Sequence, residues 1–424
     1  MAEEFFDKQT INDVPIANGQ TVLLRADYNV PLDEAGHVVS DERIKQSLPT
    51  VRALLDRNVK LIIASHLGRP NGKYSQAESL LSVAKRLSEM IGHNVKFVPD
   101  CVGEEPGKAA ACLESGQVLM LENLRFHPGE SSNDDDFAEQ LASVAGNDAL
   151  FVQDGFGVVH RTNASTVAIT KHLPSVAGLL LEEEVTTIRR AMEQPKRPLM
   201  AVIGGAKIAD KIGVLRQFIR IADILTIGGA MATDFWAAKG VDVAASLYDK
   251  ENLEAAREIM RQAKTEAGKR DFVFCLPTDA VVATEISPNA PTRNVNLARG
   301  EKLEPNEKIL DIGPLSAQAN ADLVGQANTI YWNGPLGVTE VPGPNGSAGP
   351  FAKGTYALIE AAISQPGHRP YFLVGGGDSA SVLERLKLVS RVNESGFVST
   401  GGGASQDLIA GEPLPGVEAL LDKK

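Results

Sequence analysis

Two kinds of chemical group follow the short apolar runs of this sequence, and each kind keeps to its own half of the chain. In the first half the runs lead into arginine, histidine and short polar residues, in RADYNVP, SHLGRP, LENLRFH and GFGVVHR. In the second half they lead into glycines, in GGAK, GGAM, NGPLG, GGGDS and TGGGAS. Guanidinium groups bind phosphate and carboxylate oxygens in pairs, and glycine-rich turns at helix starts bring backbone N–H groups close to a polyphosphate. The first half therefore predicts a site for a small, multiply charged anion, and the second half a site for a nucleotide.

Two lysines lie beside the first of these glycine turns. Lys207 and Lys211 are four residues apart in VIGGAKIADKIGVLRQFI, where isoleucine and leucine recur at helical spacing. On a helix that includes them, the two lysines would share one face of its first turns. A cation at a helix N-terminus opposes the helix dipole at a cost of about 0.3–1 kcal/mol, and a bound anion reverses that cost. Both lysines could instead extend into water, but the glycine turn favours contact with phosphate.

An acidic residue, Asp378, follows the glycines of GGGDS at the expected start of a helix. An aspartate in that position can cap the helix. It can also hold the Mg²⁺ that nucleotide phosphates bring with them, because one or two carboxylates suffice for this ion. The residue alone leaves both roles open.

The elements that position these groups are predicted by β-branched runs that alternate with segments of helical periodicity. The expected strands are residues 21–25, 60–65, 95–98, 117–121 and 149–153 in the first half, and 199–203, 224–228, 271–276, 328–332, 371–375 and 397–400 in the second. Uninterrupted apolar strands between helices are typical of parallel sheets covered on both faces. The predicted fold class is α/β, with two Rossmann-like domains whose parallel sheets face each other across a hinged cleft.

The domain boundaries follow from one long helical segment. Residues 179–198 keep a helical rhythm until two prolines stop it, which is typical of a helix that joins two halves. We expect an N-terminal, anion-binding domain at 1–178, the interdomain helix and hinge at 179–198, a nucleotide-binding domain at 199–404 and a C-terminal segment at 405–424. A chain of 424 residues is long for one core, which agrees with two domains.

Composition limits the partners and the compartment. The formal net charge of −12 argues against binding nucleic acid through a general basic surface. The sequence contains no run of membrane-spanning length, its N-terminus does not resemble a signal peptide, and its three cysteines form no CxxC pair. We therefore expect a cytoplasmic protein without nucleic-acid or membrane partners.

Two other classes of protein fit part of this pattern. Gly375, Gly377 and Ala380 fit the G-x-G-x-x-A motif of an NAD-dependent dehydrogenase. The next expected strand, however, ends in Ser399 and Thr400, without the acidic residue that would bind the ribose. A non-enzymatic two-domain anion-binding protein would explain the arginines but not the lysines and the glycine turns.

Taken in order, these segments resemble phosphoglycerate kinase. The matches are RADYNVP, SHLGRP, LENLRFH, GFGVVHR, GGAKIADK, WNGPLGVTE, GGGDS and STGGGAS, which together cover nearly the whole chain. The resemblance implies a monomeric glycolytic enzyme that reversibly transfers a phosphoryl group, with Mg²⁺, between ATP and the carboxylate of 3-phosphoglycerate. The products would be ADP and 1,3-bisphosphoglycerate, formed by direct in-line transfer after domain closure. Residues 405–424 would return to the N-terminal domain.

The resemblance also implies a role for each site residue. The residues expected to bind 3-phosphoglycerate are Asp27, Asn29, Arg43, His66, Arg69, Arg125 and Arg161. Those expected to bind the nucleotide are Gly205, Lys207, Lys211, Gly229, Asn333, Glu340, Gly375, Gly376, Gly377, Asp378 and Ser379, with Glu340 on the ribose and Asp378 on Mg²⁺. Arg43, Lys207 and Lys211 are the expected catalytic residues, because phosphoryl transfer to an ionised carboxylate needs alignment and charge neutralisation rather than a general base. Departures from the usual family pattern at Gly155, Val158, Val159 and Thr339 remove none of these charged groups.

Overall fold

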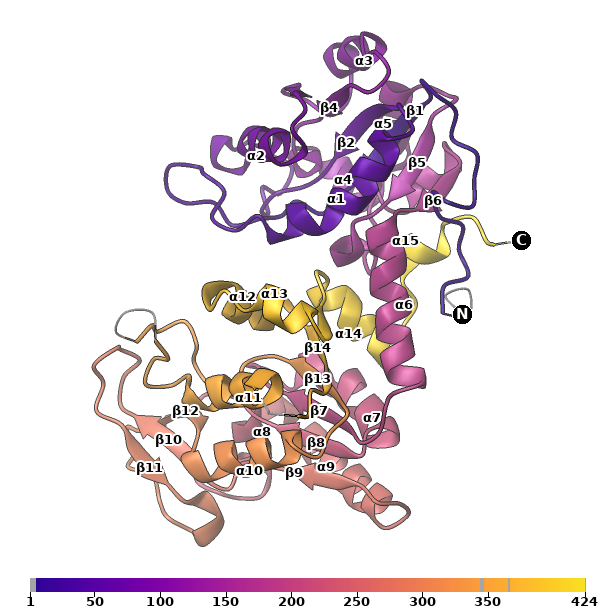
Figure 1. The fold of residues 1–424 in the computed structure, drawn as a ribbon. Coiled ribbons are helices and arrows are strands. Elements are labelled where there is room, and N and C mark those ends of the chain that lie inside the picture. Colours follow the sequence, from indigo (N-terminus) through magenta and orange to yellow (C-terminus); the bar gives the residue numbers. More distant parts are fainter. Residues whose placement is uncertain (1–4, 344–346, 365–366, 424) are drawn as a thin grey trace. The chain divides into compact units, whose positions relative to one another are not determined.

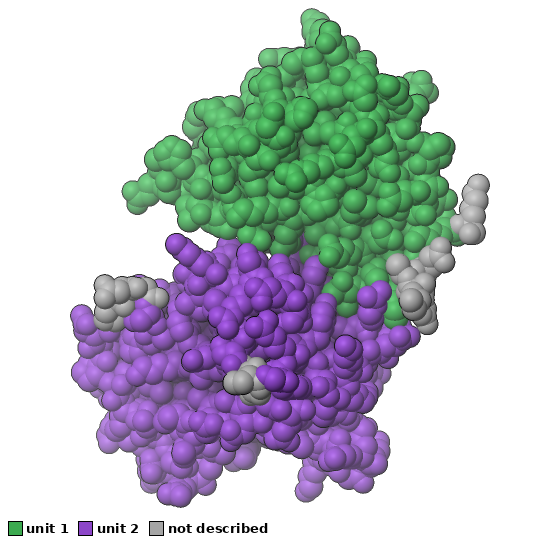
Figure 2. Space-filling view, in the orientation of Figure 1, with its two compact units in different colours: residues 1–187, 413–424 green, residues 188–412 purple. Residues whose placement is uncertain are grey.

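The computed structural model describes residues 5–343, 347–364 and 367–423, and the chain forms two compact units. Unit 1 consists of residues 1–187 and 413–424, and unit 2 of residues 188–412 (Figure 2). None of the helices described has the length and the apolar composition of a membrane span.

Unit 1 is built on a six-stranded parallel sheet of order β3-β4-β2-β1-β5-β6. The strands are β1 (Thr21–Arg25), β2 (Lys60–Ala64), β3 (Val95–Phe97), β4 (Val118–Met120), β5 (Leu150–Gln153) and β6 (Ser175–Ala177). Successive side chains of a strand point to opposite faces, so Val22 and Leu24 enter one buried cluster while Leu23 enters another. Because both faces of the sheet are buried, most residues of these strands are apolar, and the strands appear in the sequence as continuous apolar runs.

Helices cover both faces of this sheet (Figure 1). Apolar residues of α1 (Glu42–Leu55) and α2 (Leu81–Ile91) belong to the cluster that contains Val22. Those of α3 (Glu104–Ala111) and α5 (Asp135–Ala145) belong to the cluster that contains Leu23. The parallel strands consequently direct their carboxyl ends, and the loops that follow them, to one edge of the unit.

Unit 2 contains a second six-stranded parallel sheet, of order β15-β14-β13-β7-β8-β9. Its strands are β7 (Leu199–Ile203), β8 (Ile224–Ile227), β9 (Val273–Cys275), β13 (Thr329–Asn333), β14 (Tyr371–Gly375) and β15 (Gly396–Val398). The helices are α7 (Ile212–Ile221), α8 (Met231–Ala238), α9 (Leu253–Ala267), α10 (Pro314–Val324), α11 (Lys353–Ser364), α12 (Gly377–Arg385), α13 (Val389–Asn393) and α14 (Gly402–Ala410). Apolar residues of α10, α11, α12 and α13 share one core with Trp332 and Val374.

The α/β class and the two parallel sheets agree with the prediction, and the expected strand ends differ by at most two residues from those observed. Two features were not predicted. One is the short strand β6, and the other is a three-stranded antiparallel sheet of β10 (Ala280–Ala283), β11 (Arg293–Val295) and β12 (Lys308–Ile312) in unit 2. Strands of three to five residues are too short to show a clear periodicity, and charged residues also interrupt β11 and β12.

The long helix α6 (Leu179–Glu193) contains the junction between the units, which falls between residues 187 and 188. It ends before Pro195 and Pro198, so it is shorter than the expected segment of residues 179–198. Asp154, at the end of β5, accepts hydrogen bonds from the backbone N–H groups of Leu180 (3.0 Å) and Leu181 (3.4 Å). Burial raises the pKa of Asp154 to about 7, although these hydrogen bonds and one from Thr50 oppose the shift.

The C-terminal residues of the chain pack within unit 1. The backbone N–H of Leu421 donates to Ser175 (3.0 Å), its carbonyl accepts from Gln9 (2.7 Å), and the N–H of Gly416 donates to Val159 (2.9 Å). This segment, which includes α15 (Pro415–Glu418), is therefore held by backbone hydrogen bonds to the start of β6, to Gln9 and to Val159.

Candidate active site

A buried ion pair lies at the carboxyl end of β1. Asp27 follows this strand and is 8% exposed, and Arg43, from the first turn of α1, donates a hydrogen bond to its Oδ2. The backbone N–H of Asn29 donates to Oδ1 of the same carboxylate (3.2 Å). Burial opposes the charge of Asp27, but the charges of Arg43, His66 and Arg25 outweigh that effect and hold its pKa below the ordinary value. The pair thus fixes the guanidinium of Arg43 before any ligand binds.

The loops after β1, β2 and β4 are tied to one another through the backbone of Gly68. Its N–H donates to the side-chain oxygen of Asn29 (2.8 Å), and its carbonyl accepts from Nη1 of Arg125 (2.6 Å). His66, in the same β2 loop, places Nδ1 3.2 Å from Nη2 of Arg25 and 3.9 Å from Oδ1 of Asp27. Five of the seven residues expected to bind the acid, Asp27, Asn29, Arg43, His66 and Arg125, are therefore linked directly or through one shared neighbour.

The pKa values of this region show that cations are concentrated there. Burial and the charges of Arg25 and Arg161 lower the pKa of Arg125 to about 10. Burial and the charge of Arg161 lower the pKa of His160 to about 4. Neighbouring cations that repel one another are stabilised by a bound anion. The exposed Arg161 belongs to this cluster, whereas the exposed Arg69 is positioned by a hydrogen bond from its backbone N–H to Oε1 of Glu78 (2.8 Å).

In unit 2, glycine turns bring three loops into backbone contact. The N–H groups of Gly204, Gly205 and Gly229 donate to the carbonyls of Asn333 (2.9 Å), Pro335 (3.1 Å) and Leu336 (2.9 Å). A Cβ on Gly204 would lie 2.2 Å from the oxygen of Pro335, and Gly205 has a φ of +112°. Only glycine fits both positions, so the loops after β7 and β13 form one surface made largely of backbone.

The expected helix that carries both lysines on one face is wrong. Residues Ala209–Lys211 form a 3₁₀ turn, and α7 starts only at Ile212. The glycine turn directs the chain so that Lys211 points into the unit and Lys207 remains exposed. The apolar periodicity predicted a helix that starts too early. Ile208 is buried and fits the periodicity, but it lies outside the helix.

The ammonium group of Lys211 is hydrogen-bonded to an uncharged amide side chain. Its Nζ donates to Oδ1 of Asn333, whose Nδ2 in turn donates to the hydroxyl of Tyr331 (2.8 Å). Burial lowers the pKa of Lys211 to about 8, although the charges of Asp378 and Asp210 oppose the shift. A bound anionic phosphate would stabilise the charged form of an ammonium group that is buried against a neutral amide.

The turn after β14 starts helix α12. Gly376 precedes the helix with a φ of +91°, and Asp378 is exposed in the first turn. The buried Ser379 accepts a hydrogen bond from the N–H of Gly334 (2.7 Å), so its Oγ joins α12 to the loop after β13. Glu340 is exposed beside the buried Thr339, whose carbonyl accepts from Arg385 (3.1 Å).

The sequence of this chain matches a known protein family over almost its entire length. The family model for phosphoglycerate kinase matches residues 11–412. The chain belongs to the phosphoglycerate kinase family. It is 41% identical over 416 residues to the phosphoglycerate kinase of Chlorobium phaeovibrioides, covering 98% of this chain and 100% of the relative. It is 42% identical to that of Moorella thermoacetica with the same coverage, also over 416 residues. The structure of phosphoglycerate kinase from Coxiella burnetii aligns with a TM-score of 0.78 at 34% identity, covering 97% of this chain and 98% of that one.

Membership of the phosphoglycerate kinase family confirms the predicted reaction class. The chain is a phosphotransferase that uses ATP or ADP and acts on the carboxyl group of 3-phosphoglycerate. The alternatives of a dehydrogenase and of a non-enzymatic binding protein are not supported. The G-x-G-x-x-A match at Gly375 reflects the same strand-turn-helix geometry, used here by a kinase family.

Two residues in contact with the Asp27–Arg43 pair and with His66 were not predicted from the sequence as site residues. A Cβ on Gly157 would lie 2.2 Å from Oδ2 of Asp27 and 3.3 Å from Nη1 of Arg43. Arg25 is buried and donates to Ser165 (2.8 Å), with Glu130 at 3.8 Å. The glycines of GFGVVHR are a signal for Gly157, whereas Ser165 and Glu130, which position Arg25, lie more than 100 residues away from it in the sequence.

Two of the residues noted as departures from the family pattern, Gly155 and Val158, lie against each other. A Cβ on Gly155 would lie 3.2 Å from a methyl group of Val158, which is buried. A larger residue at 155 would therefore crowd the Val158 side chain. Val159 is also buried and receives the backbone hydrogen bond from Gly416.

The Gly157 contact predicts a stability loss. Gly157→Ala should lower the free energy of unfolding by about 1–3 kcal/mol, because a methyl group has no space beside the Asp27–Arg43 pair. Gly107→Ala, inside α3 with nothing within 4 Å of the new Cβ, should instead raise it by about 0.4–1 kcal/mol. Urea unfolding of both variants checks this, and equal effects at the two sites would contradict the crowding at Gly157.

Proposed function

We propose that the strand-end loops of unit 1 bind 3-phosphoglycerate and those of unit 2 bind ATP or ADP. The observation that carries this assignment is the difference in chemistry between the two sets of loops. Unit 1 contains the buried Asp27–Arg43 ion pair, and the charges of Arg25 and Arg161, together with burial, lower the pKa of Arg125. In unit 2, close-packed glycine turns surround a buried lysine that is bonded to a neutral amide. Guanidinium groups suit a carboxylate and a compact phosphate, and backbone turns with a lysine suit a polyphosphate.

We assign the following roles for the transfer step. The acid is bound by Asp27, Asn29, Arg43, His66, Arg69, Arg125 and Arg161, and the nucleotide by Gly205, Lys207, Lys211, Gly229, Asn333, Glu340 and the segment 375–379. The acceptor carboxylate is ionised at neutral pH, so it attacks the terminal phosphorus of ATP directly and no residue has to remove a proton. Arg43, Lys211 and Lys207 neutralise the charge that spreads over the transferred group, and the Asp27 carboxylate keeps Arg43 in position.

The residues of unit 2 fit a nucleotide-bound Mg²⁺. Asp378 presents an exposed carboxylate in the first turn of α12, directly after the glycines. Mg²⁺ keeps several waters and needs one or two carboxylates besides the phosphates. Asp378 would hold this ion, which would supply neutralising charge to the phosphate oxygens.

Transfer requires the acid and the nucleotide to come into contact while water is excluded. We propose that the two units close on their ligands and that α6, which contains the junction, is the hinge. From its membership of the phosphoglycerate kinase family, we also propose that the enzyme acts as a monomer, without nucleic acid or membrane. Its three free cysteines and its ATP substrate agree with a cytoplasmic location.

Calorimetric titration of two crossed variants tests the assignment. Arg125→Ala should weaken 3-phosphoglycerate binding about 10- to 100-fold, the effect of losing a hydrogen bond to a charged group, and should leave Mg-ADP binding unchanged. Asp378→Asn should weaken Mg-ADP binding and leave 3-phosphoglycerate binding unchanged.

Wild-type protein and the exposed Arg52→Ala variant of α1 serve as references. Loss of both ligands in one variant, with circular dichroism unchanged, would contradict the division of the two substrates between the units.

A further inference from the structure

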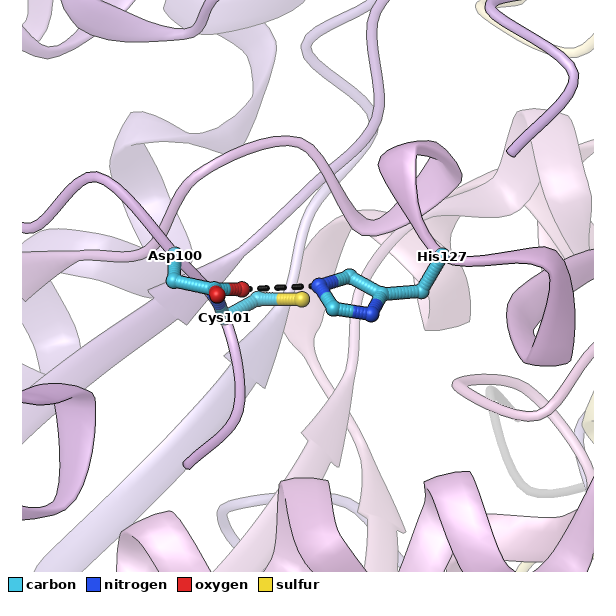
Figure 3. Close-up of side chains that lie close together, drawn as sticks. All are labelled: Asp100, Cys101 and His127. Carbon is cyan, nitrogen blue, oxygen red and sulfur yellow. Dashed lines mark hydrogen bonds and ion pairs between the residues drawn. The ribbon is translucent and has the colours of Figure 1, made fainter. Parts of the chain in front are cut away.

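Three side chains with different metal-binding chemistry meet in unit 1, apart from the residues assigned to the substrates. Asp100, Cys101 and His127 place one potential ligand atom each within 4.8 Å of the others (Figure 3). Nε2 of His127 already lies 2.7 Å from Oδ1 of Asp100. Figure 3 shows the imidazole ring directed at both the carboxylate and the sulfur atom.

The cluster joins two neighbouring strands of the sheet. Asp100 and Cys101 lie in the turn between β3 and α3. His127 lies between the 3₁₀ turn Leu124–Phe126, which follows β4, and α4 (Pro128–Ser132). Because β3 and β4 are paired, an ion held by these residues would cross-link the segments that leave the edge of the sheet.

Local contacts hold the three groups in place. The backbone N–H of Cys101 donates to Oδ1 of Asp100 (2.7 Å), and the ring of His127 stacks on that of Phe137 at 5.3 Å. Cys101 is 1% exposed, whereas the side chains of His127 and Asp100 are 31% and 46% exposed. The sulfur therefore lies at the inner end of the cluster, and the other two groups leave a path from solvent.

We propose that Asp100, Cys101 and His127 form a binding site for a divalent transition-metal ion, with Zn²⁺ the best match. One thiolate, one imidazole and one carboxylate suit a tetrahedral ion with water as its fourth ligand, whereas Mg²⁺ and Ca²⁺ prefer oxygen ligands alone. Metal–ligand bonds of about 2.0–2.3 Å place ligand atoms roughly 3–4 Å apart, so small side-chain movements complete the site.

Binding exchanges the hydrogen bond between His127 and Asp100 for two bonds to the ion. The Cys101 thiol releases its proton to solvent, and His127 binds through Nε2 while its proton resides on Nδ1. This ion differs in chemistry from the Mg²⁺ that Asp378 of unit 2 would hold, because that Mg²⁺ would be bound through oxygen atoms alone. A thiolate-specific signal therefore separates the two ions.

Cobalt titration of the full-length, metal-free protein tests the site. Co²⁺ should bind with one equivalent that shows a thiolate-to-cobalt charge-transfer band, and Zn²⁺ should displace it. The band should disappear in Cys101→Ser, and the affinity should fall at least tenfold in His127→Asn. Cys112→Ser removes an exposed thiol near the end of α3 and should leave the band unchanged.

Circular dichroism of each metal-free variant shows whether it is folded, and His127→Asn, at the half-exposed position, tests the site independently of the buried cysteine. A wild-type protein without the thiolate band at millimolar Co²⁺ would overturn the proposal. A band that persists in Cys101→Ser, or that depends on Cys112, would overturn it as well.

Discussion

Replacing Arg43 by alanine is expected to lower kcat by about 10²- to 10³-fold, the loss typical for one group that stabilises transition-state charge. The guanidinium is fixed by Asp27 through Nη1, and its other N–H groups remain available to the transferred phosphoryl group. Because the proposed contact would strengthen as charge spreads in the transition state, the KM values should change much less than kcat. Steady-state kinetics with both substrates saturating measures the effect.

Two further variants make the Arg43 result specific. Arg43→Lys keeps a positive charge but loses the planar fork, so its kcat should lie between those of wild type and Arg43→Ala. Arg52→Ala, an exposed position of the same helix α1, should retain near wild-type kinetics. Because Arg43→Ala leaves the buried Asp27 without this partner, its unfolding must be measured in parallel. A folded Arg43→Ala enzyme with kcat within a few-fold of wild type would refute the assigned role.

The strands that form the two large sheets could be predicted because they are buried on both faces. Leu23 and its neighbours Val22 and Leu24 serve different cores, so the whole strand must be apolar and stands out from its surroundings. In the small antiparallel sheet of unit 2, Arg293 in β11 and Lys308 in β12 interrupt the apolar pattern. The four-residue strand β10 was missed although it is buried on both faces. Double burial therefore explains the strands that could be predicted, but it does not by itself make a short strand recognisable.

The side chains at the strand ends could be predicted from chemistry, but their local geometry could not. Lys211 follows a glycine turn, and Ile208 extends the apolar rhythm upstream, which suggested one continuous helix. The positive φ of Gly205 and the 3₁₀ turn interrupt that helix, and both depend on contacts with the loop after β13. Gly157 was missed for a similar reason, because its proximity to Asp27 exists only after β1 and β5 have paired.

Removing the charge of Lys211 should be as damaging as the loss of Arg43. Lys211→Met retains most of the buried aliphatic stem and removes the ammonium group, and we expect kcat to fall by about 10²- to 10³-fold. Lys264→Ala, an exposed lysine of α9, should leave the kinetics unchanged and controls for the general effect of losing one positive charge.

Lys211 should also impose a pH dependence that the variant lacks. Burial lowers the pKa of this lysine to about 8 in the free enzyme, so half of the enzyme carries the ammonium form at about pH 8, and that form is lost as the pH rises further. Since kcat/KM reports the ionisation of free enzyme, kcat/KM for Mg-ATP should decline above about pH 8. Bound phosphates stabilise the ammonium form and raise its pKa, so kcat should stay level to higher pH than kcat/KM. A Lys211→Met profile that retains the same decline above pH 8 would assign that ionisation to another group and remove Lys211 from the transfer step.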